Sequence, residues 1–112
     1  MDGRRTEGST KRQVEIARTT DIPLNEVRTF EVEGLPIAVC NLGGRFYAID
    51  DRCTHDDGPL GEGRLDGPAI ECPRHGARFD VRTGELVVSK EIKLRMFQTR
   101  IEDGKLFVRL ED

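Results

Sequence analysis

The chain has 112 residues, of which 36% are apolar and 35% charged, and its formal net charge is −3. This length predicts one domain, and the lack of a long basic run beyond the N-terminus argues against a nucleic-acid-binding protein. No apolar run approaches the roughly 20 residues that a membrane span needs, and the start of the chain lacks the apolar core of a signal peptide, so we expect a cytoplasmic protein without a membrane partner.

Residues 1–12 are polar and show neither helical nor strand periodicity, which predicts a flexible tail before a single domain over residues 13–112. Short apolar runs separated by glycine-containing turns then follow. They predict strands at residues 14–17, 30–33, 35–40, 45–49, 69–72, 77–81, 85–88, 92–101 and 105–110. Helical periodicity is weak everywhere except over residues 23–27. The predicted fold class is therefore all-β, an antiparallel sandwich or barrel.

Two short motifs contain both histidines and two of the three cysteines. The first is Cys53-Thr54-His55, and the second, after sixteen intervening residues, is Cys72-Pro73-Arg74-His75. The glycine-rich sequence between them places both motifs on loops at strand ends. In a reducing compartment, a thiolate beside an imidazole is more often a metal ligand than half of a disulfide. We therefore predict that Cys53, His55, Cys72 and His75 bind metal.

One thiolate and one imidazole in each motif are compatible with two kinds of metal site. Two metal ions can be bound, with the cysteines on one and the histidines on the other. A single zinc ion also takes two cysteines and two histidines. Neighbouring ligands of structural zinc are usually separated by two to four residues, whereas only Thr54 separates Cys53 from His55. The spacing therefore favours the site with two metal ions.

The pattern C-x-H, sixteen residues, C-x-x-H resembles the motif of Rieske [2Fe–2S] proteins. Over about residues 14–110, the chain is similar to the low-potential Rieske-type ferredoxins of bacteria. Further matching residues are Gly58, Leu60, Gly63, the run from Gly76 to Asp80, and Thr83-Gly84. The resemblance implies one [2Fe–2S] cluster per chain, with Cys53 and Cys72 on one iron and His55 and His75 on the other. It also implies a small cluster-binding subdomain, at about residues 50–80, inserted in an antiparallel β-sandwich.

The same resemblance implies a function. The protein would be a one-electron carrier, the ferredoxin component of a multicomponent, ring-hydroxylating-type oxygenase, and not itself an enzyme. A flavin-dependent reductase would be its electron donor, and an oxygenase or another redox protein its acceptor. The alternatives are an accessory protein for iron–sulfur assembly or redox sensing, and the small subunit of a reductase.

Residues near the ligands bear on the reduction potential. Neutral imidazoles in place of two thiolates put Rieske centres at roughly −150 to +300 mV. High-potential members of the family add a disulfide, a serine and a tyrosine around the cluster. This chain has Gly58 and Arg74 at the cysteine positions, and Ala77 and Phe79 at the hydroxyl positions. We therefore expect a potential at the low end of the range.

Three further features carry expectations of their own. Cys40 lies on an apolar strand pattern, which predicts a buried packing residue and not a fifth ligand. The segment Val87–Glu91 stands where related ferredoxins have a proline-bearing stretch near the cluster. Acidic residues around the first motif form either a docking face or only a solvated loop; they are Asp50, Asp51, Asp56, Asp57 and Glu62.

Overall fold

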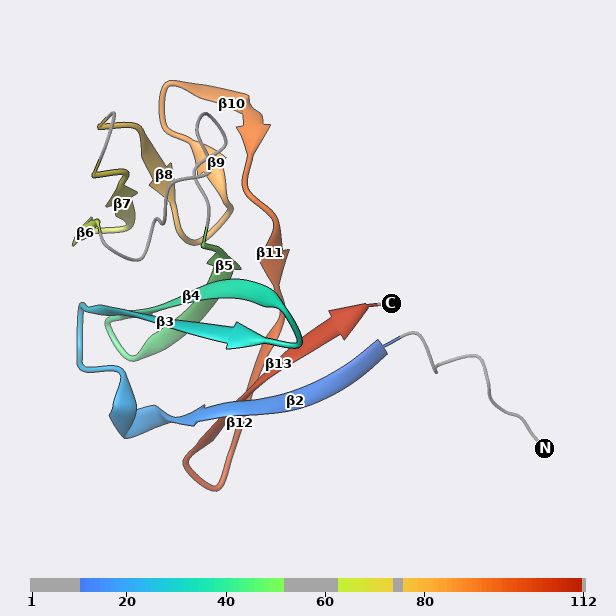
Figure 1. Ribbon diagram of the computed structural model, residues 1–112. Coiled ribbons are helices and arrows are strands. Elements are labelled where there is room, and N and C mark those ends of the chain that lie inside the picture. Colours follow the sequence, from blue (N-terminus) through green and yellow to red (C-terminus); the bar gives the residue numbers. More distant parts are fainter. Residues whose placement is uncertain (1–10, 52–62, 74–75, 112) are drawn as a thin grey trace.

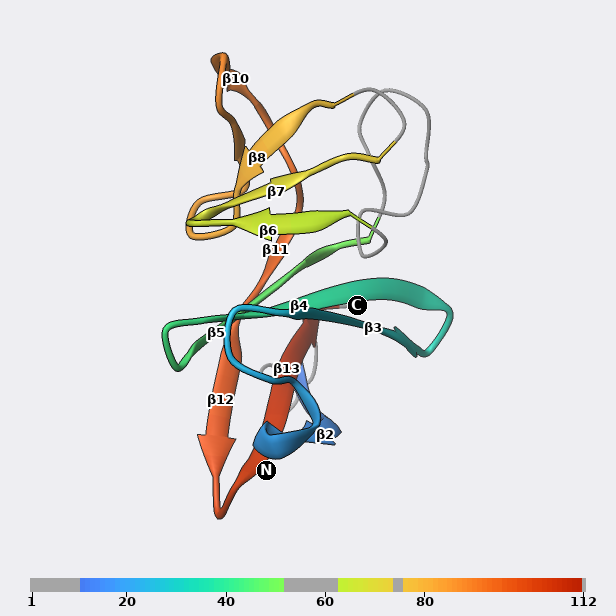
Figure 2. The same cartoon turned by 90° about the vertical axis from the view of Figure 1, so that its left-hand side faces the viewer.

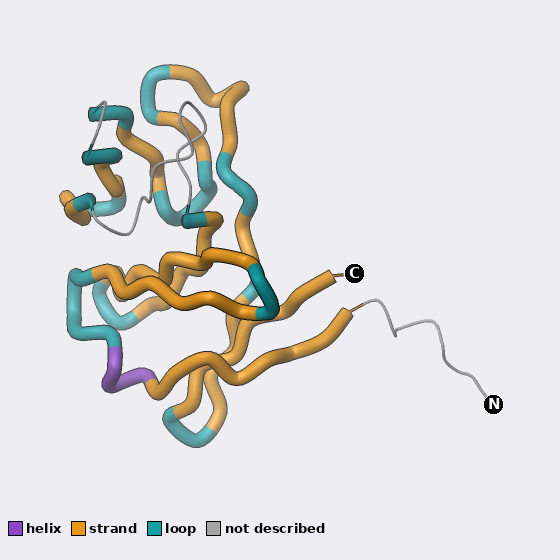
Figure 3. The backbone as a smooth tube through the Cα atoms, in the orientation of Figure 1, coloured by secondary structure: helices purple, strands orange, loops and turns teal. Residues whose placement is uncertain are grey.

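The computed structural model describes residues 11–51, 63–73 and 76–111, and these ranges are almost entirely β-structure. Antiparallel strands form three sheets, which we call the base, middle and upper sheets, and Figures 1 and 2 show them stacked in that order. The predicted all-β, antiparallel fold is confirmed. The short 3-10 helix η2 (Thr19–Asp21) is the only helical element in the described ranges (Figure 3).

Each sheet combines strands from different parts of the chain. The base sheet has the order β12-β13-β2 and is formed by β12 (Thr99–Glu102), β13 (Lys105–Glu111) and β2 (Lys11–Arg18). The middle sheet has the order β11-β5-β4-β3 and is formed by β11 (Met96–Phe97), β5 (Arg45–Asp50), β4 (Leu35–Leu42) and β3 (Val27–Val32). The upper sheet has the order β10-β9-β8-β7-β6 and is formed by β10 (Ser89–Lys93), β9 (Glu85–Leu86), β8 (Arg78–Asp80), β7 (Ala69–Glu71) and β6 (Arg64–Asp66).

Strand β4 shows why the layers stack. Its central residues are apolar without interruption, and successive side chains of a strand point to opposite faces. Ala38 and Cys40 belong to the core shared with the upper sheet, while Ile37 and Val39 belong to the core shared with the base sheet. A strand that is buried on both faces needs this continuous apolar run. The middle sheet is thus covered on both sides.

The run of residues 92–101, predicted as one strand, is divided among all three sheets. It contributes the end of β10, all of β11 and the start of β12. Within β11, Met96 packs toward the upper core and Phe97 toward the base core. The single long strand is therefore wrong, because the segment passes from layer to layer and changes its pairing partner each time.

Two other local predictions need correction. Residues 23–27 are not helical; the helical turn lies earlier, at η2, and Asn25 has φ +61°, which an α-helix does not accommodate. Strand β2 begins at Lys11, so Lys11 and Arg12 belong to the base sheet and not to the expected tail. Residues 1–10, the remainder of that tail, lie outside the described ranges.

The hairpin predictions hold. The turns at Glu33-Gly34, Gly43-Gly44 and Asp103-Gly104 all have positive φ values and connect antiparallel neighbours. Asn41 reinforces the second of them, because its side-chain Oδ1 accepts a hydrogen bond of 2.9 Å from the Gly44 amide. In the parts of the chain that the structure describes, no helix has the length and apolar character that crossing a bilayer requires.

Candidate metal centre

Of the four predicted ligands, the structure describes Cys72. Cys53 and His55 lie in the range 52–62 and His75 in the range 74–75, both outside the described residues. Within the described residues, no group of three or more His, Cys, Asp or Glu side chains is placed to hold a metal ion. The ligand set therefore remains a prediction, and its structural support comes from the surroundings of Cys72.

Cys72 directly follows β7, at the point where the chain turns toward β8. Its backbone N–H donates a hydrogen bond of 2.7 Å to the Ala77 carbonyl, and its own carbonyl accepts one of 2.9 Å from the Gly76 N–H. These two bonds close the loop that contains the second motif. Gly76 has φ +73°, a conformation that L-residues adopt at a cost. The turn itself therefore favours a glycine directly after the motif.

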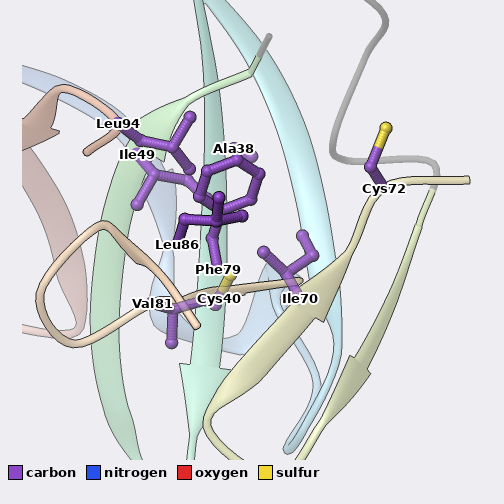
Figure 4. Packing of buried hydrophobic residues seen from close by; sticks show 9 residues of the cluster. All are labelled: Ala38, Cys40, Ile49, Ile70, Cys72, Phe79, Val81, Leu86 and Leu94. Atoms are coloured by element: carbon purple, nitrogen blue, oxygen red, sulfur yellow. The ribbon is translucent and has the colours of Figure 1, made fainter. Parts of the chain in front are cut away.

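The Cys72 side chain fits a cluster ligand. It is fully buried and forms no disulfide, and both of its backbone polar groups are already satisfied within the loop. Cys72 belongs to the same buried cluster as Ile70 and Phe79, and Figure 4 shows its sulfur pointing away from the other labelled side chains. A free, water-excluded thiol at the end of a strand suits the thiolate ligation that iron–sulfur clusters require.

The strands beside Cys72 are joined by an exposed charge network centred on Arg78. Its guanidinium lies 2.9 Å from the Asp66 carboxylate and 3.7 Å from that of Glu71, so it links β8 to β6 and β7. The partners are more than a third exposed, which limits each pair to roughly 0.2–1 kcal/mol. The network lies across three neighbouring strands near the end of β7, where Cys72 begins the loop. In the sequence, Arg78 matched the family only as part of the run from Gly76 to Asp80, and nothing in its neighbours marks a cross-strand pair.

The segment Val87–Glu91 forms an exposed turn followed by β10. Val87 and Val88 are 53% and 87% exposed, while the Val87 N–H donates a hydrogen bond of 2.8 Å to the Arg78 carbonyl. The backbone of this turn is thus fixed to β8, the strand that follows the second motif. Its apolar side chains point to solvent, a feature that alternation in the sequence could not predict.

Cys40 is a packing residue, as predicted. It is fully buried in the core between the middle and upper sheets. Burial, with a smaller contribution from the negative charge of Asp51, raises the pKa of the Cys40 thiol to about 12. A thiol with this pKa stays protonated at neutral pH and does not compete for metal.

Of the five acidic residues around the first motif, the structure describes two. Asp51 is only 7% exposed and its N–H donates a hydrogen bond of 3.0 Å to the Pro36 carbonyl, so it does not belong to an exposed docking face. Asp50 is half-buried in β5. The remaining three, Asp56, Asp57 and Glu62, lie outside the described residues, and their part in docking stays a prediction.

Comparison with known proteins identifies the architecture around Cys72. A family model described as the Rieske [2Fe-2S] domain matches residues 12–98. The chain belongs to the Rieske [2Fe-2S] domain family. The cofactor of a Rieske domain is a [2Fe–2S] cluster, which confirms the predicted cofactor over the zinc alternative. The chain's buried Cys72 thiol agrees with this cofactor.

Relatives of this Rieske domain match over most of their own length. The ferredoxin component of biphenyl 2,3-dioxygenase from Rhodococcus jostii (strain RHA1) is 39% identical over 86% of this chain and 91% of that protein. Ferredoxin CarAc from Metapseudomonas resinovorans is 42% identical over 72% and 77%, respectively. Among solved structures, the ferredoxin of carbazole 1,9a-dioxygenase from Nocardioides aromaticivorans IC177 superposes with a TM-score of 0.80, at 28% identity over 86% of this chain and 95% of that one.

A further solved structure contains two redox proteins together. It is described as a complex of reduced oxygenase and oxidised ferredoxin in carbazole 1,9a-dioxygenase, and one of its chains matches the Rieske domain with a TM-score of 0.80 and 36% identity. The match covers 86% of this chain and 91% of that one. The predicted Rieske sandwich is thereby confirmed.

Proposed function

We propose that this protein is a one-electron carrier, the ferredoxin component of a ring-hydroxylating-type oxygenase system. The observation that carries the proposal is the near full-length match to proteins named as ferredoxin components of dioxygenases. This chain matches such components over 88% to 99% of their own length. The same comparison supports the role of carrier and not of catalyst.

Cys53 and Cys72 would hold one iron of the cluster, and His55 and His75 the other. The cluster supplies reversible storage of one electron, and replacing two thiolates by neutral imidazoles makes that electron easier to accept. The chain's own contribution is to exclude water from the Cys72 sulfur and to fix its loop by the two backbone hydrogen bonds to Gly76 and Ala77. Small structural change on electron uptake is what an efficient carrier requires, and a loop closed in this way resists displacement.

The electron would arrive from a flavin-dependent reductase and leave to a terminal oxygenase. Support for the acceptor comes from the solved complex of an oxygenase with a ferredoxin similar to this chain. The reductase completes the chain of transfer, because a one-electron carrier must be reduced before each delivery. We place the protein in the cytoplasm, where reducing conditions keep the thiols available as ligands.

The test is to purify the protein and measure iron, labile sulfide and the electron paramagnetic resonance spectrum of the reduced form. We expect two iron and two sulfide per chain, and the rhombic spectrum of a Rieske centre. His55→Ala and His75→Ala should each abolish this spectrum, as should Cys72→Ser. Cys40→Ala is the matched control, because Cys40 is equally buried but packs in the core, and its spectrum should be unchanged.

The carrier role is tested separately, by reconstitution with the reductase and oxygenase of a ring-hydroxylating system. Product formation should depend on the amount of this protein added, and should be lost with Cys72→Ser. A protein that carries the cluster but exchanges electrons with neither component would contradict the role in oxygenases and leave the assembly or sensing alternatives.

A further inference from the structure

A groove runs along the segment that passes from the middle sheet to the base sheet. It consists of two hollows with volumes of about 360 Å³ and 210 Å³ that share Gln98 and Arg109. The first is completed by Arg95, Met96 and Phe97. The second is completed by Gln13, Thr99, Arg100, Phe107 and Val108. We call this the arginine groove.

The groove concentrates positive charge on a protein whose net charge is −3. Its lining contains three arginines and no acidic residue. In the described parts of the chain, neither Arg95 nor Arg109 forms an ion pair. Arg100 is partly neutralised by Glu102, at 2.6 Å. Two guanidinium groups therefore face the groove without an anionic partner among these residues.

Aromatic rings orient the guanidinium groups. The Arg95 guanidinium carbon lies 4.7 Å from the centroid of the Phe97 ring, and that of Arg100 lies 5.9 Å from the centroid of the Phe107 ring. Stacking on Phe97 holds the planar guanidinium of Arg95 while leaving its N–H donors available, whereas Arg100 donates hydrogen bonds to Gln13 and Glu102. The same rings give the groove an apolar floor.

Amide groups alternate with these charges. Gln98 lies between the two hollows. Its backbone carbonyl accepts a hydrogen bond of 2.9 Å from the backbone N–H of Arg109, which connects the segment after β11 to β13. The Gln13 side-chain oxygen accepts one of 2.7 Å from Arg100. Side-chain amides can pair with the N–H and C=O groups of a bound polypeptide backbone.

We propose that the arginine groove binds an acidic peptide segment of a partner protein. The two hollows suit an extended ligand. A guanidinium group can donate two parallel hydrogen bonds to one carboxylate. The aromatic rings suit apolar side chains of the ligand, and the glutamine amides suit its backbone. The inference stands on the groove alone and does not require the electron-carrier role.

The groove lies on a different layer from the strand that leads to Cys72. Figures 1 and 2 show β12 and β13 in the base layer, separated by the middle sheet from β7, the strand that leads to Cys72. A segment bound along β11 and β12 would therefore leave the upper sheet uncovered. Such a partner could stay attached while the metal centre meets another protein.

The experiment uses the cluster-loaded protein and a fluorescently labelled oligoglutamate peptide, with binding followed by fluorescence anisotropy at low ionic strength. We expect saturable binding that Arg95→Gln/Arg109→Gln weakens by about tenfold or more. Arg45→Gln/Arg64→Gln is the matched control, since it removes the same charge from exposed arginines of β5 and β6 outside the groove; its affinity should stay within about twofold of the parent protein. Arg95→Lys/Arg109→Lys keeps the charge and loses the fork, so its affinity should fall between the two.

Three outcomes would overturn the proposal. One is equal weakening in the groove and control variants, which would mean diffuse electrostatic attraction. Another is displacement of the peptide by inorganic phosphate at matched ionic strength, which would identify a small-anion site. The last is an absence of saturable binding, with or without self-association in sedimentation. The visible spectrum of each variant, recorded on the same samples, reports cluster loading and separates a failure of this proposal from a failure of the carrier role.

Discussion

Cys40 illustrates how burial sets the chemistry of a single residue. Its pKa of about 12 lies well above the ordinary value of 9.0, because the folded state removes the thiol from water and keeps it near Asp51. In the unfolded chain the thiol deprotonates near pH 9, so above that pH the unfolded state binds fewer protons and is favoured. The stabilising contribution is complete below about pH 9 and is lost as pH rises toward 12.

This shift gives a pH-dependence prediction. Between about pH 9 and 11, the free energy of unfolding should fall by about 1.4 kcal/mol per pH unit from Cys40 alone. Cys40→Ala should remove that part of the slope, since alanine has no proton to lose. Urea unfolding of both proteins at about pH 8 and pH 10 measures it. Parallel losses in the two proteins would mean that other groups cause the alkaline destabilisation.

Ala77 is the residue at which the reduction potential can be tested. Its backbone carbonyl accepts the hydrogen bond from the Cys72 N–H, and its side chain packs against the buried cluster to which Cys72 belongs. Ala77→Ser would place a hydroxyl donor there, and donors near a cluster favour its more negative, reduced state. We expect the parent midpoint near the low end of the Rieske range, roughly −150 mV, and a higher midpoint in the variant. Ala17→Ser, in the base sheet, is the control that should leave the voltammogram unchanged.

At the scale of elements, Gly84 joins the upper sheet to the segment that leaves it. Its carbonyl accepts a hydrogen bond of 2.7 Å from the Leu94 N–H, and its φ is +82°. A Cβ atom built on Gly84 would lie 2.7 Å from the Leu94 carbonyl oxygen and 3.1 Å from Cγ of Met96. The turn between β8 and β9 therefore approaches the neighbouring backbone too closely for any side chain.

Gly84→Ala should destabilise the protein by about 2–4 kcal/mol, since backbone strain and overpacking add. Gly104→Ala is a matched control, because its φ is +74° and nothing lies within 4 Å of the added Cβ. That variant should lose only the strain of about 1–2 kcal/mol. Chemical denaturation of both measures the difference, and equal losses would refute close packing at Gly84.

The elements also show where sequence reasoning succeeds and fails. Hairpins such as Leu35–Leu42 with Arg45–Asp50 were predictable, because glycine pairs mark the turn between two apolar runs. The division of residues 92–101 among three sheets was not, since no glycine or proline marks the changes of partner. Strand β6 was also missed, because its few residues, Arg64–Asp66, are mostly polar and exposed and only their pairing with β7 makes them a strand.

For the metal site, the sequence was more informative than for the packing around it. The ligand spacing led to the Rieske family because one thiolate and one imidazole recur in each motif, a chemical pattern that needs no knowledge of the fold. The sequence grouped Asp51 with neighbouring acids as either a docking face or a solvated loop, since adjacent Asp residues look alike in sequence while only the fold buries this one. Burial depends on which layer covers a residue, and that is a property of the whole molecule.

At the scale of the whole molecule, three stacked layers place Cys72, a proposed cluster ligand, and the arginine groove on different layers. The upper core contains Ile70, Phe79 and Leu86, and it attaches the upper sheet to Ala38 and Ile49 of the middle sheet. The base core attaches the middle sheet to Leu106 and Val108. Because β4 of the middle sheet packs into both cores, the two outer layers are joined through it. Partners bound at the loop of Cys72 and at the arginine groove would therefore contact different layers of one body.

The last prediction concerns electron exchange between this body and its partners. If Asp56 and Asp57 steer a reductase to the metal centre, second-order reduction should slow as salt rises, since the Debye length is about 8 Å at physiological ionic strength. Asp56→Lys/Asp57→Lys should slow reduction in stopped-flow experiments and leave the midpoint almost unchanged. Glu15→Lys/Glu31→Lys is the control, because it changes the net charge equally at exposed positions of β2 and β3, away from the upper sheet. Equal slowing in both variants would assign the effect to net charge, whereas slowing confined to the first pair assigns it to a local docking face around the metal centre.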